Sequence, residues 1–310
     1  MMNKVIGIDI GGTSIKLALF DMTGLMLDQW SIPTNTANEG SGIPADIIQS
    51  IRERMSQGTQ CLEEILGIGI GVPGPVNEEV VKRAVNLGWT NFPLKQMIEK
   101  SLNIPVALLN DANAAALGEM WKGSTEHVRN LVFVTIGTGV GGGIIVDGKI
   151  LNGEHASGGE IGHIPVHSTE ERICGCGNIN CLECYGSANG MVKTMNRLAD
   201  RSAVSNTKEI FDLIEADDPQ AKEALKITVD YLGRAIAGVM NTLDPEEIVI
   251  GGGVSEAGPL FLTPLRAAID SYAFPQISGS FRLRKAILGN EAGMYGAAYQ
   301  IVSTLKEYAV

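Results

Sequence analysis

Residues 4–20 read K-V-I-G-I-D-I-G-G-T-S-I-K-L-A-L-F, and this stretch decides how the rest of the chain is interpreted. Apolar side chains recur at every second position from Ile15 to Leu19, which is the period of a β-strand. Residues 5–10 form a second apolar run, and the two runs are separated only by Gly-Gly-Thr-Ser. We therefore expect two strands, at 5–10 and 15–20, joined by a tight turn.

A similar block recurs at residues 131–146, which read L-V-F-V-T-I-G-T-G-V-G-G-G-I-I-V. An apolar strand, expected at 131–136, again runs into a glycine-rich turn, and a second strand is expected at 144–146. Helical sequence follows each block. The recurrence indicates a weak internal repeat, and strands alternating with helices in this way predict two α/β domains.

The remaining periodic segments fill in this pattern. Further strands are expected at 65–72, 105–109 and 247–250, and helices are expected at 43–56, 110–122, 189–201, 205–242 and 292–306. The last of these helices carries small residues on one face, which suits close packing. Glu119, two turns into an alanine-rich helix, is expected to be a solvated or capping charge.

The composition excludes several classes of function. The chain has 310 residues, with 24 Lys and Arg against 35 Asp and Glu, a net charge of −11 and a pI near 4.9. Nucleic acids and anionic membranes need a basic face, so neither is an expected partner. The start of the chain lacks the layout of a signal peptide, and no window approaches the roughly 18–20 apolar residues of a membrane span. We therefore expect a cytoplasmic protein.

Potential metal ligands cluster in the middle of the chain. Residues 154–163 read E-H-A-S-G-G-E-I-G-H, and residues 174–183 read C-G-C-G-N-I-N-C-L-E. Four of the five cysteines lie between positions 174 and 184, and in a reducing compartment such clustering favours a metal over disulfides. Three Cys and one His are a common tetrahedral Zn²⁺ set. The predicted ligands of a structural Zn²⁺ are His163, Cys174, Cys176 and Cys181.

Three residues beside these ligands complete the prediction. Glu160 and Glu183 flank the cluster, so a bound metal would also fix two carboxylates that can read a polar ligand. We expect loss of the metal to weaken binding of that polar ligand more than it weakens binding at the glycine-rich loops, because the loops lie elsewhere in the sequence. Cys184 has poorer spacing as a ligand, and we expect it to be a free cysteine.

Three glycine-rich loops each follow an apolar strand: Gly11–Gly12–Thr13, Gly137–Thr138–Gly139 and Gly251–Gly252–Gly253. Glycine lets backbone N–H groups approach phosphate oxygens closely, and a threonine hydroxyl can donate to the same oxygens. Asp9, just before the first loop, would hold Mg²⁺ directly or through water. For any single loop, a hairpin turn that needs a positive φ is the stronger interpretation. Three such loops in one chain favour phosphate binding.

Two other glycine patterns are rejected. Matches to G-x-G-x-x-G begin at Gly69 and Gly137, but neither is followed by the helix that a dinucleotide site requires. The stretch from Gly143 to Ile150 resembles a P-loop, yet it lacks Ser or Thr after Lys149.

Asn110 and Asp111 stand where a strand is expected to end and a helix to begin. Both residue types favour the N-cap position, so capping is one interpretation. A helix N-terminus also keeps a carboxylate ionised, and an ionised carboxylate can act as a base toward a hydroxyl. The residues alone leave these two interpretations open.

Together, the motifs of this chain resemble the ROK family of repressors and sugar kinases. The resemblance rests, in order along the chain, on D-I-G-G-T-S-I-K, G-V-P-G-P-V, L-L-N-D-A-N-A-A-A-L-G-E, T-I-G-T-G-V-G-G-G-I-I-V-D-G, G-G-E-I-G-H, C-G-C-G-x-x-x-C-L-E and I-V-I-G-G-G-V. It implies a two-domain actin/hexokinase-like (ribonuclease H-like) α/β fold with an interdomain cleft. The implied domains are a smaller one at 1–115 plus 294–310 and a larger one with the zinc loop at 116–293.

The resemblance also implies an activity, which is ATP-dependent phosphorylation of a hexose at its 6-hydroxyl in the presence of Mg²⁺. Residues 84–95, A-V-N-L-G-W-T-N-F-P-L-K, favour glucose. Asp111 matches the family's catalytic base, and Lys16 belongs to the first nucleotide-binding motif. The implied contacts to sugar hydroxyls are Asn110, Glu160, His163 and Glu183. A homodimer is the family expectation. Relatives usually carry Gly at the position of Asn180, and Asn tolerates the left-handed backbone that this position would need.

Two alternatives to glucose phosphorylation stay open. The first is another sugar kinase of the family, acting on N-acetylmannosamine, fructose or allose. The second is a non-catalytic sugar-sensing regulator. Family repressors carry a helix-turn-helix domain ahead of D-I-G-G-T, whereas only eight residues precede Asp9 here, which favours the kinase.

Overall fold

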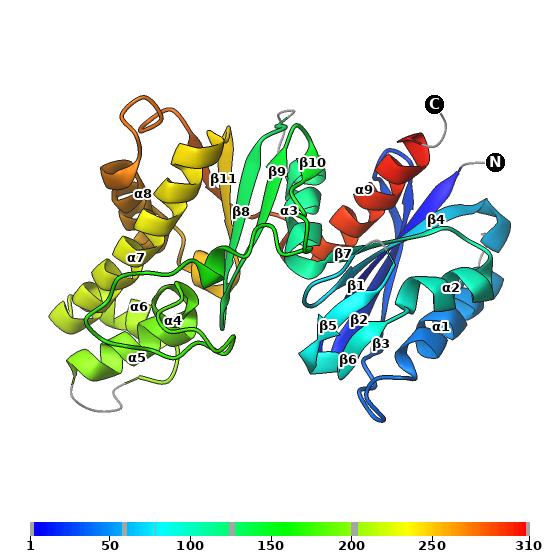
Figure 1. The fold of residues 1–310 in the computed structure, drawn as a ribbon, viewed down its shortest axis with the longest axis horizontal. Helices are drawn as coiled ribbons and strands as arrows, with labels where there is room; N and C mark the ends of the chain where they lie inside the picture. The colour runs from blue at the N-terminus through cyan, green and yellow to red at the C-terminus, as the bar shows by residue number, and fades with distance from the viewer. Residues whose placement is uncertain (1–2, 58–60, 78, 124–127, 200–203, 308–310) are drawn as a thin grey trace. The chain divides into compact units, whose positions relative to one another are not determined.

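The computed structural model describes residues 3–57, 61–77, 79–123, 128–199 and 204–307 (Figure 1). The chain forms two compact units. Unit 1 comprises Met1–His127, Ile150–Gly158 and Asn290–Val310, and unit 2 comprises Val128–Lys149 and Gly159–Gly289. The domain boundaries expected from the sequence stay a prediction.

Unit 1 is built on a five-stranded sheet in the order β3-β2-β1-β4-β7. Its strands are β1 (Lys4–Ile10), β2 (Ser14–Asp21), β3 (Met26–Pro33), β4 (Ile65–Val72) and β7 (Val106–Asn110). A separate hairpin joins β5 (Val81–Ala84) and β6 (Trp89–Phe92). The helices of unit 1 are α1 (Ile43–Gln57), α2 (Leu94–Leu102), α3 (Asp111–Lys122) and α9 (Ala292–Glu307), with short 3₁₀ turns at Leu62–Glu64 and Val85–Leu87.

Unit 2 is built on a sheet in the order β10-β9-β8-β11-β12. Its strands are β8 (Leu131–Ile136), β9 (Val140–Val146), β10 (Lys149–Ile150), whose second residue belongs to unit 1, β11 (Glu247–Gly251) and β12 (Arg282–Lys285). Its helices are α4 (Glu183–Gly186), α5 (Ala188–Leu198), α6 (Thr207–Glu215), α7 (Pro219–Leu243) and α8 (Pro259–Tyr272). Two 3₁₀ turns also matter for the site, η3 (Ile161–His163) and η4 (Gly253–Ala257).

The two sheets share one topology, which confirms the internal repeat. In unit 1, β1 pairs antiparallel with β2 and parallel with β4. In unit 2, β8 pairs antiparallel with β9 and parallel with β11. In each sheet, a second parallel strand extends this core, β7 in unit 1 and β12 in unit 2. The glycine-rich turns predicted from the sequence therefore occupy equivalent places, between the first and second strands of each sheet.

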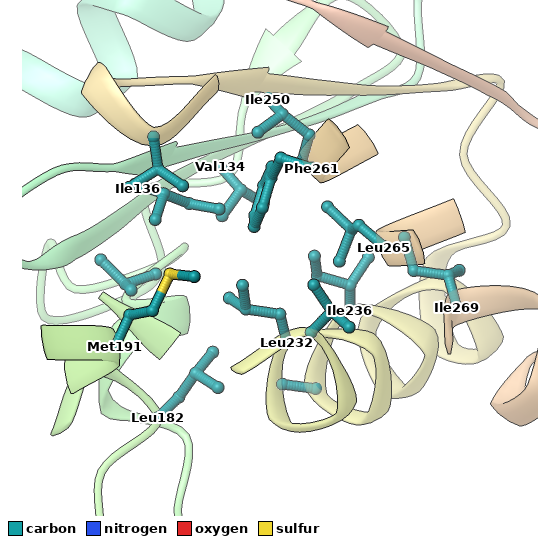
Figure 2. Packing of buried hydrophobic residues seen from close by; sticks show 14 of the residues in the cluster. Val134, Ile136, Leu182, Met191, Leu232, Ile236, Ile250, Phe261, Leu265 and Ile269 are labelled. Carbon is teal, nitrogen blue, oxygen red and sulfur yellow. The ribbon is translucent and has the colours of Figure 1, made fainter. Parts of the chain in front are cut away.

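The core of unit 2 explains why its strands read as continuous apolar runs. Val134 of β8 and Ile250 of β11 are fully buried, as is Phe261 of α8 (Figure 2). Leu232 and Ile236 of α7 pack into the same cluster. Parallel strands covered by helices need no polar face, so the alternation seen in β2 is absent here.

Close packing of α9 holds unit 1 together. A methyl group on Gly7 of β1 would lie 2.1 Å from the carbonyl oxygen of Met294, and one on Gly69 of β4 would lie 1.7 Å from that of Ala297. A methyl group on Gly296 would lie 1.7 Å from the carbonyl oxygen of Ala114 in α3. The small residues of α9 thus permit the close packing that the sequence predicted for one face, and they permit it on two sides, toward the sheet and toward α3.

Glu119 was predicted wrongly. It is fully buried in α3, not solvated. A methyl group on Gly118 would lie 2.2 Å from the carbonyl oxygen of Ala292, so α3 packs on α9 at backbone distance. The alanines and glycines that identified the helix also let it be covered on more than one face, and this coverage encloses Glu119.

Other boundaries differ from the expectations. β9 begins at Val140, so the glycines at 141–143 lie within the strand and not in the turn before it. The helical stretch expected at 205–242 is interrupted, because Asp218 caps a new helix whose first residue is Pro219. The sequence analysis missed β3, β12, α2, α8 and the β5–β6 hairpin. Within the described residues, no helix has the length and apolarity needed to cross a membrane.

The packing of α9 predicts a large effect of one methyl group. Gly69→Ala should destabilise unit 1 by about 1–3 kcal/mol or more, because the new atom meets backbone that cannot rotate away. Gly238→Ala is the control, since Gly238 is an exposed position of α7 where a methyl group meets nothing within 4 Å, and the change should stabilise the helix by up to about 1 kcal/mol. Thermal unfolding of both variants tests this. A Gly69→Ala protein that melts with the wild type would contradict the packing argument.

Candidate functional site

Unit 1 gathers several predicted site residues at one edge of its sheet. β1 and β7 both run parallel to β4, so their carboxyl ends meet at the same edge. Asp9 is the penultimate residue of β1, and Asn110 is the last residue of β7. The first glycine loop follows β1 directly, and Asp111 begins α3. Asp9, the loop and Asp111 are thereby brought to one edge.

Asp9 lies in a partly buried position that disfavours its charge. Burial raises the pKa of the Asp9 carboxyl above its ordinary value of 3.8, and the nearby Lys16 ammonium offsets part of that rise. Lys16 faces Asp9 across the β1–β2 pair, and its Nζ donates to the carbonyl oxygen of Asn290 at 3.1 Å. A methyl group on Gly293 would lie 2.8 Å from Cγ of Asp9, so the start of α9 closes over the carboxylate. A carboxylate that loses solvation on burial is stabilised in its ionised form by a nearby cation, so the position of Asp9 is suited to one.

The two interpretations of Asn110 and Asp111 separate in the structure. Asn110 is the N-cap of α3, because its Oδ1 accepts from the backbone N–H groups of Ala112 at 2.9 Å and Asn113 at 3.2 Å. Its Nδ2 donates to the carbonyl oxygen of Gly74 at 3.1 Å. Asp111 is exposed in the first turn of α3. Oδ1 of Asp111 accepts from the same N–H of Ala112 at 2.8 Å, but the N-cap position itself is occupied by Asn110.

The glycine loops do not have the backbone conformation of glycine-requiring hairpins. Of the glycines in the three loops, Gly252 alone has a positive φ, at 81°. One glycine in each loop has space around it: methyl groups on Gly12, Gly137 and Gly253 would meet no described atom within 4 Å. Neither strain nor protein packing explains glycine at these positions. Close approach of a ligand to the backbone would explain it.

Unit 2 brings the second and third glycine loops together. β8 and β11 are parallel neighbours, with Thr135 paired to Gly251. A methyl group on Gly252 would lie 2.4 Å from the carbonyl oxygen of Ile136, so the third loop is seated against the start of the second. The backbones of both loops thus lie at the carboxyl edge of this sheet, where the N–H of Gly137 donates to the carbonyl oxygen of Gly139 at 2.9 Å.

The four predicted metal ligands also converge in unit 2. The ligand atoms of His163, Cys174, Cys176 and Cys181 all lie within 4.8 Å of one another. Nδ1 of His163 lies 3.7 Å from Sγ of Cys174, and the Sγ atoms of Cys176 and Cys181 lie 3.6 Å apart. Ligands placed tetrahedrally at about 2.3 Å from an ion are about 3.8 Å apart. The arrangement, which we call the Cys/His cage, therefore fits a four-coordinate metal. Cys184 is not part of it.

Without an ion, the thiols of the cage are in different electrostatic states. Burial raises the pKa of Cys174 to about 12 and also raises that of Cys181. A backbone hydrogen bond from Asn178 lowers the pKa of Cys176. A metal binds thiolates, so binding at this cage would displace protons from Cys174 and Cys181.

The predicted sugar-contact residues of unit 2 lie around the cage. Nε2 of His163, the ring nitrogen that faces away from Cys174, lies 3.9 Å from Oε2 of Glu160. Glu183 begins α4, two residues after Cys181, and its Oε2 accepts from the backbone N–H of Val140 at 3.1 Å. Glu160, His163 and Glu183 are thus placed next to the metal ligands, and Glu183 also contacts the second glycine loop.

Arg172 supports the cage and was missed by the sequence analysis. Its buried guanidinium binds Glu170 through Nε and Nη2, both at 2.9 Å, and Nη1 donates to the carbonyl oxygen of Cys184 at 2.8 Å. Asn180 has the expected left-handed backbone, with φ at 59°, and its Oδ1 accepts from the N–H of Arg172 and from the hydroxyl of Tyr185. Arg172 stands between His163 and Cys174 in the sequence, and this position within the ligand motif was the signal that could have identified it.

Comparison with known proteins supports the resemblance. The family model described as ROK family matches residues 5–303. The glucokinase of Halalkalibacterium halodurans is 40% identical over 310 residues, which cover 96% of this chain and 94% of that protein. The ROK hexokinase structure from Thermus thermophilus has a TM-score of 0.86 at 31% identity, covering 99% of this chain and all 100% of that one. The ROK family glucokinase from Streptomyces griseus, in complex with glucose and AMPPNP, has a TM-score of 0.76 at 31% identity, covering 96% and 99%. These likenesses confirm the predicted actin/hexokinase-like α/β fold class.

The environment of Asp9 predicts how its replacement affects stability. A carboxyl whose pKa is raised by folding costs stability as the pH rises above its ordinary value of 3.8, because the buried group must ionise. Asp9→Asn should therefore melt above the wild type at neutral pH, with a gain that shrinks toward about pH 3.

Asp28→Asn provides a control of opposite sign. A hydrogen bond from Arg54 lowers the pKa of Asp28, so its contribution is present at neutral pH and lost in acid. Melting temperatures of both variants between about pH 3 and pH 7 test the assignment. The same trend in both would contradict it.

Proposed function

The chain belongs to the ROK family, and from this premise we propose that it is an ATP-dependent hexose kinase that phosphorylates glucose at the 6-hydroxyl. The observation that carries the proposal is the exposed Asp111 at the N-terminus of α3, at the same sheet edge as Asp9 and the first glycine loop. The relatives named as glucokinases support glucose as the sugar.

In this proposal, the glycine loops bind the phosphates of ATP. Backbone N–H groups around Gly12, Gly137 and Gly253 are placed where no side chain obstructs them. The hydroxyls of Thr13 and Thr138 would donate to the same oxygens. Phosphoryl transfer needs little covalent chemistry from the protein, so positioning and charge stabilisation supply most of the rate.

Asp9 would hold Mg²⁺, which neutralises phosphate charge when bound. The rise in the pKa of Asp9 is reversed by a cation at that position, since the cation favours the ionised carboxylate. Lys16, opposite Asp9 on β2, supplies a second positive charge at this edge.

Asp111 would accept the proton of the sugar's 6-hydroxyl. The oxygen of that hydroxyl would attack the terminal phosphorus of ATP, with ADP as the leaving group. The other hydroxyls would be bound by Asn110, Glu160, His163 and Glu183. Carboxylates and amides suit a sugar, because they pair with several hydroxyls of fixed geometry. Asn110 already uses its Oδ1 as the helix cap, so its Nδ2 is the group that would reach the sugar.

We further propose that the Cys/His cage holds a structural Zn²⁺. The ligand types and their mutual spacing support this metal. An ion bound to His163 through Nδ1 would fix the ring and direct Nε2 away from the metal. The clustered cysteines are suited to a reducing cytoplasm, and we expect a homodimer from the family resemblance.

Asp111→Asn tests the catalytic assignment. We expect kcat to fall by at least about 10², the usual effect of losing a general base, while glucose affinity changes little. Asp147→Asn, in a turn of unit 2 outside the proposed site, is the matched control and should keep wild-type kinetics. Steady-state kinetics with glucose, together with calorimetric glucose binding, separates these effects. Near-normal turnover of Asp111→Asn would refute its role as the base.

The zinc assignment predicts metal content. Purified protein should contain about one Zn²⁺ per chain, as closed four-ligand sites do. Cys184→Ser should retain the metal, and Cys176→Ser should lose it, because only Cys176 is a member of the cage. Elemental analysis of the three proteins provides the measurement. Metal loss from Cys184→Ser, or a folded and fully active metal-free wild type, would show that the ligand set is wrong.

A further inference from the structure

One carboxylate contacts both the Cys/His cage and the second glycine loop. Oε2 of Glu183 accepts a hydrogen bond from the backbone N–H of Val140 at 3.1 Å. Its other oxygen, Oε1, lies 3.8 Å from Sγ of Cys174. Val140 directly follows Gly137–Thr138–Gly139. Glu183 therefore spans the distance between a cage cysteine and the end of the loop.

The loop is shaped around this carboxylate. A methyl group on Gly139 would lie 2.1 Å from Oε2 of Glu183, although the backbone of Gly139 does not have a positive φ. Glycine at position 139 therefore leaves room for the carboxylate, and its backbone does not have the conformation of a glycine-requiring turn. The N–H of Ala188, at the start of α5, also donates to the carbonyl oxygen of Gly137 at 2.8 Å. Both ends of the loop are thus bound by the segment that follows the last cage cysteine.

The turn that carries His163 reaches the same loop from the other side of Val140. A methyl group on Gly162, in η3, would lie 2.0 Å from the carbonyl oxygen of Val140. His163 is the next residue and supplies the nitrogen ligand of the cage. The N–H of Val140 is therefore bound by a residue two positions after Cys181, and its carbonyl is packed against the residue that precedes His163.

We propose that Glu183 is a positioning residue that couples the Cys/His cage to residues 137–140, so that an ion in the cage orders this glycine loop. The metal would then serve the loop as well as the sugar contacts, which departs from the expectation that the metal supports the polar ligand more than the glycine-rich loops. The link to nucleotide binding rests on the proposed function, in which this loop binds phosphate. The coupling itself is a property of the contacts and does not depend on that function.

The hydrogen bond from the N–H of Val140 can order the loop only if its acceptor, the Glu183 carboxylate, is itself held in place. Glu183 lies two residues from Cys181 at the start of the four-residue helix α4. Fixing Cys174, Cys181 and His163 around one ion restricts the backbone that leads into Glu183. Mutating a group that orients metal ligands usually lowers metal affinity or activity by roughly 10–100-fold.

Hydrogen exchange measured by mass spectrometry on the full chain tests the coupling. Zinc-loaded and chelator-treated wild type are compared with Glu183→Ala in both states, over peptides that cover residues 131–146. Chelation of the wild type should speed exchange at Val140 by roughly tenfold or more, since a hydrogen bond to a charged acceptor is lost. Glu183→Ala should already exchange fast when zinc-loaded, and chelation should then add little.

Two further variants keep the test decisive. Glu183→Gln retains an oxygen acceptor for the N–H of Val140 and should exchange close to the wild type when zinc-loaded. Glu171→Gln changes an exposed carboxylate of the same loop region and should respond to chelation as the wild type does. Unchanged exchange at Val140 in chelated wild type would overturn the proposal. So would an equal response to chelation in the wild type and Glu183→Ala.

Calorimetric titration with AMPPNP and Mg²⁺ separates this proposal from the proposed function. Where the loop binds phosphate, zinc-loaded Glu183→Ala and chelated wild type should both lose nucleotide affinity by roughly tenfold or more. Coupled exchange without any AMPPNP binding would retain the inference and refute the kinase assignment. Normal AMPPNP binding, together with exchange at Val140 that does not respond to chelation, would refute the inference and leave the kinase assignment standing.

Discussion

Unit 1 depends on the approach of α9 to the sheet at backbone distance. Gly7 and Gly69 allow this contact, and Gly296 allows α9 to meet α3 in the same way. Gly293, at the start of α9, then closes over the carboxylate of Asp9. The packing that stabilises the unit therefore also withdraws Asp9 from water and raises its pKa, which is the effect that the proposed cation would oppose.

Unit 2 repeats the topology of unit 1 but uses its carboxyl edge differently. Two glycine loops meet there, and the Cys/His cage lies next to one of them through Glu183. No carboxylate corresponds to Asp9 in β8, where Thr135 pairs with Gly251. The proposed roles are divided accordingly: unit 1 supplies the cation site, the base and the first glycine loop, and unit 2 supplies the other two glycine loops and the metal-supported contacts.

Much of the fold and of the candidate site could be predicted from the sequence, because the signals for these parts lie between residues close together in the chain. The alternation from Ile15 to Leu19 gave the first hairpin, and the spacing of the cysteines gave the cage. Features that rest on distant partners were not predictable. β12 has the charged sequence R-L-R-K and is stabilised by ion pairs from Arg282 and Arg284 to the buried Glu247. α8 contains Pro264 in its interior, which argues against a helix until its packing is known. The contact between Glu183 and Val140 joins positions far apart in sequence, and no motif records it.

The central claim is that this chain transfers the terminal phosphate of ATP to the 6-hydroxyl of a hexose. Phosphorus and carbon NMR of the reaction mixture, with glucose, mannose, N-acetylmannosamine, fructose and allose supplied separately, tests it most directly. The account predicts Mg²⁺-dependent conversion of glucose to glucose 6-phosphate with one ADP formed per sugar phosphate, and slower conversion of the other sugars. Phosphate at another hydroxyl, or ADP formed without any sugar phosphate, would contradict it.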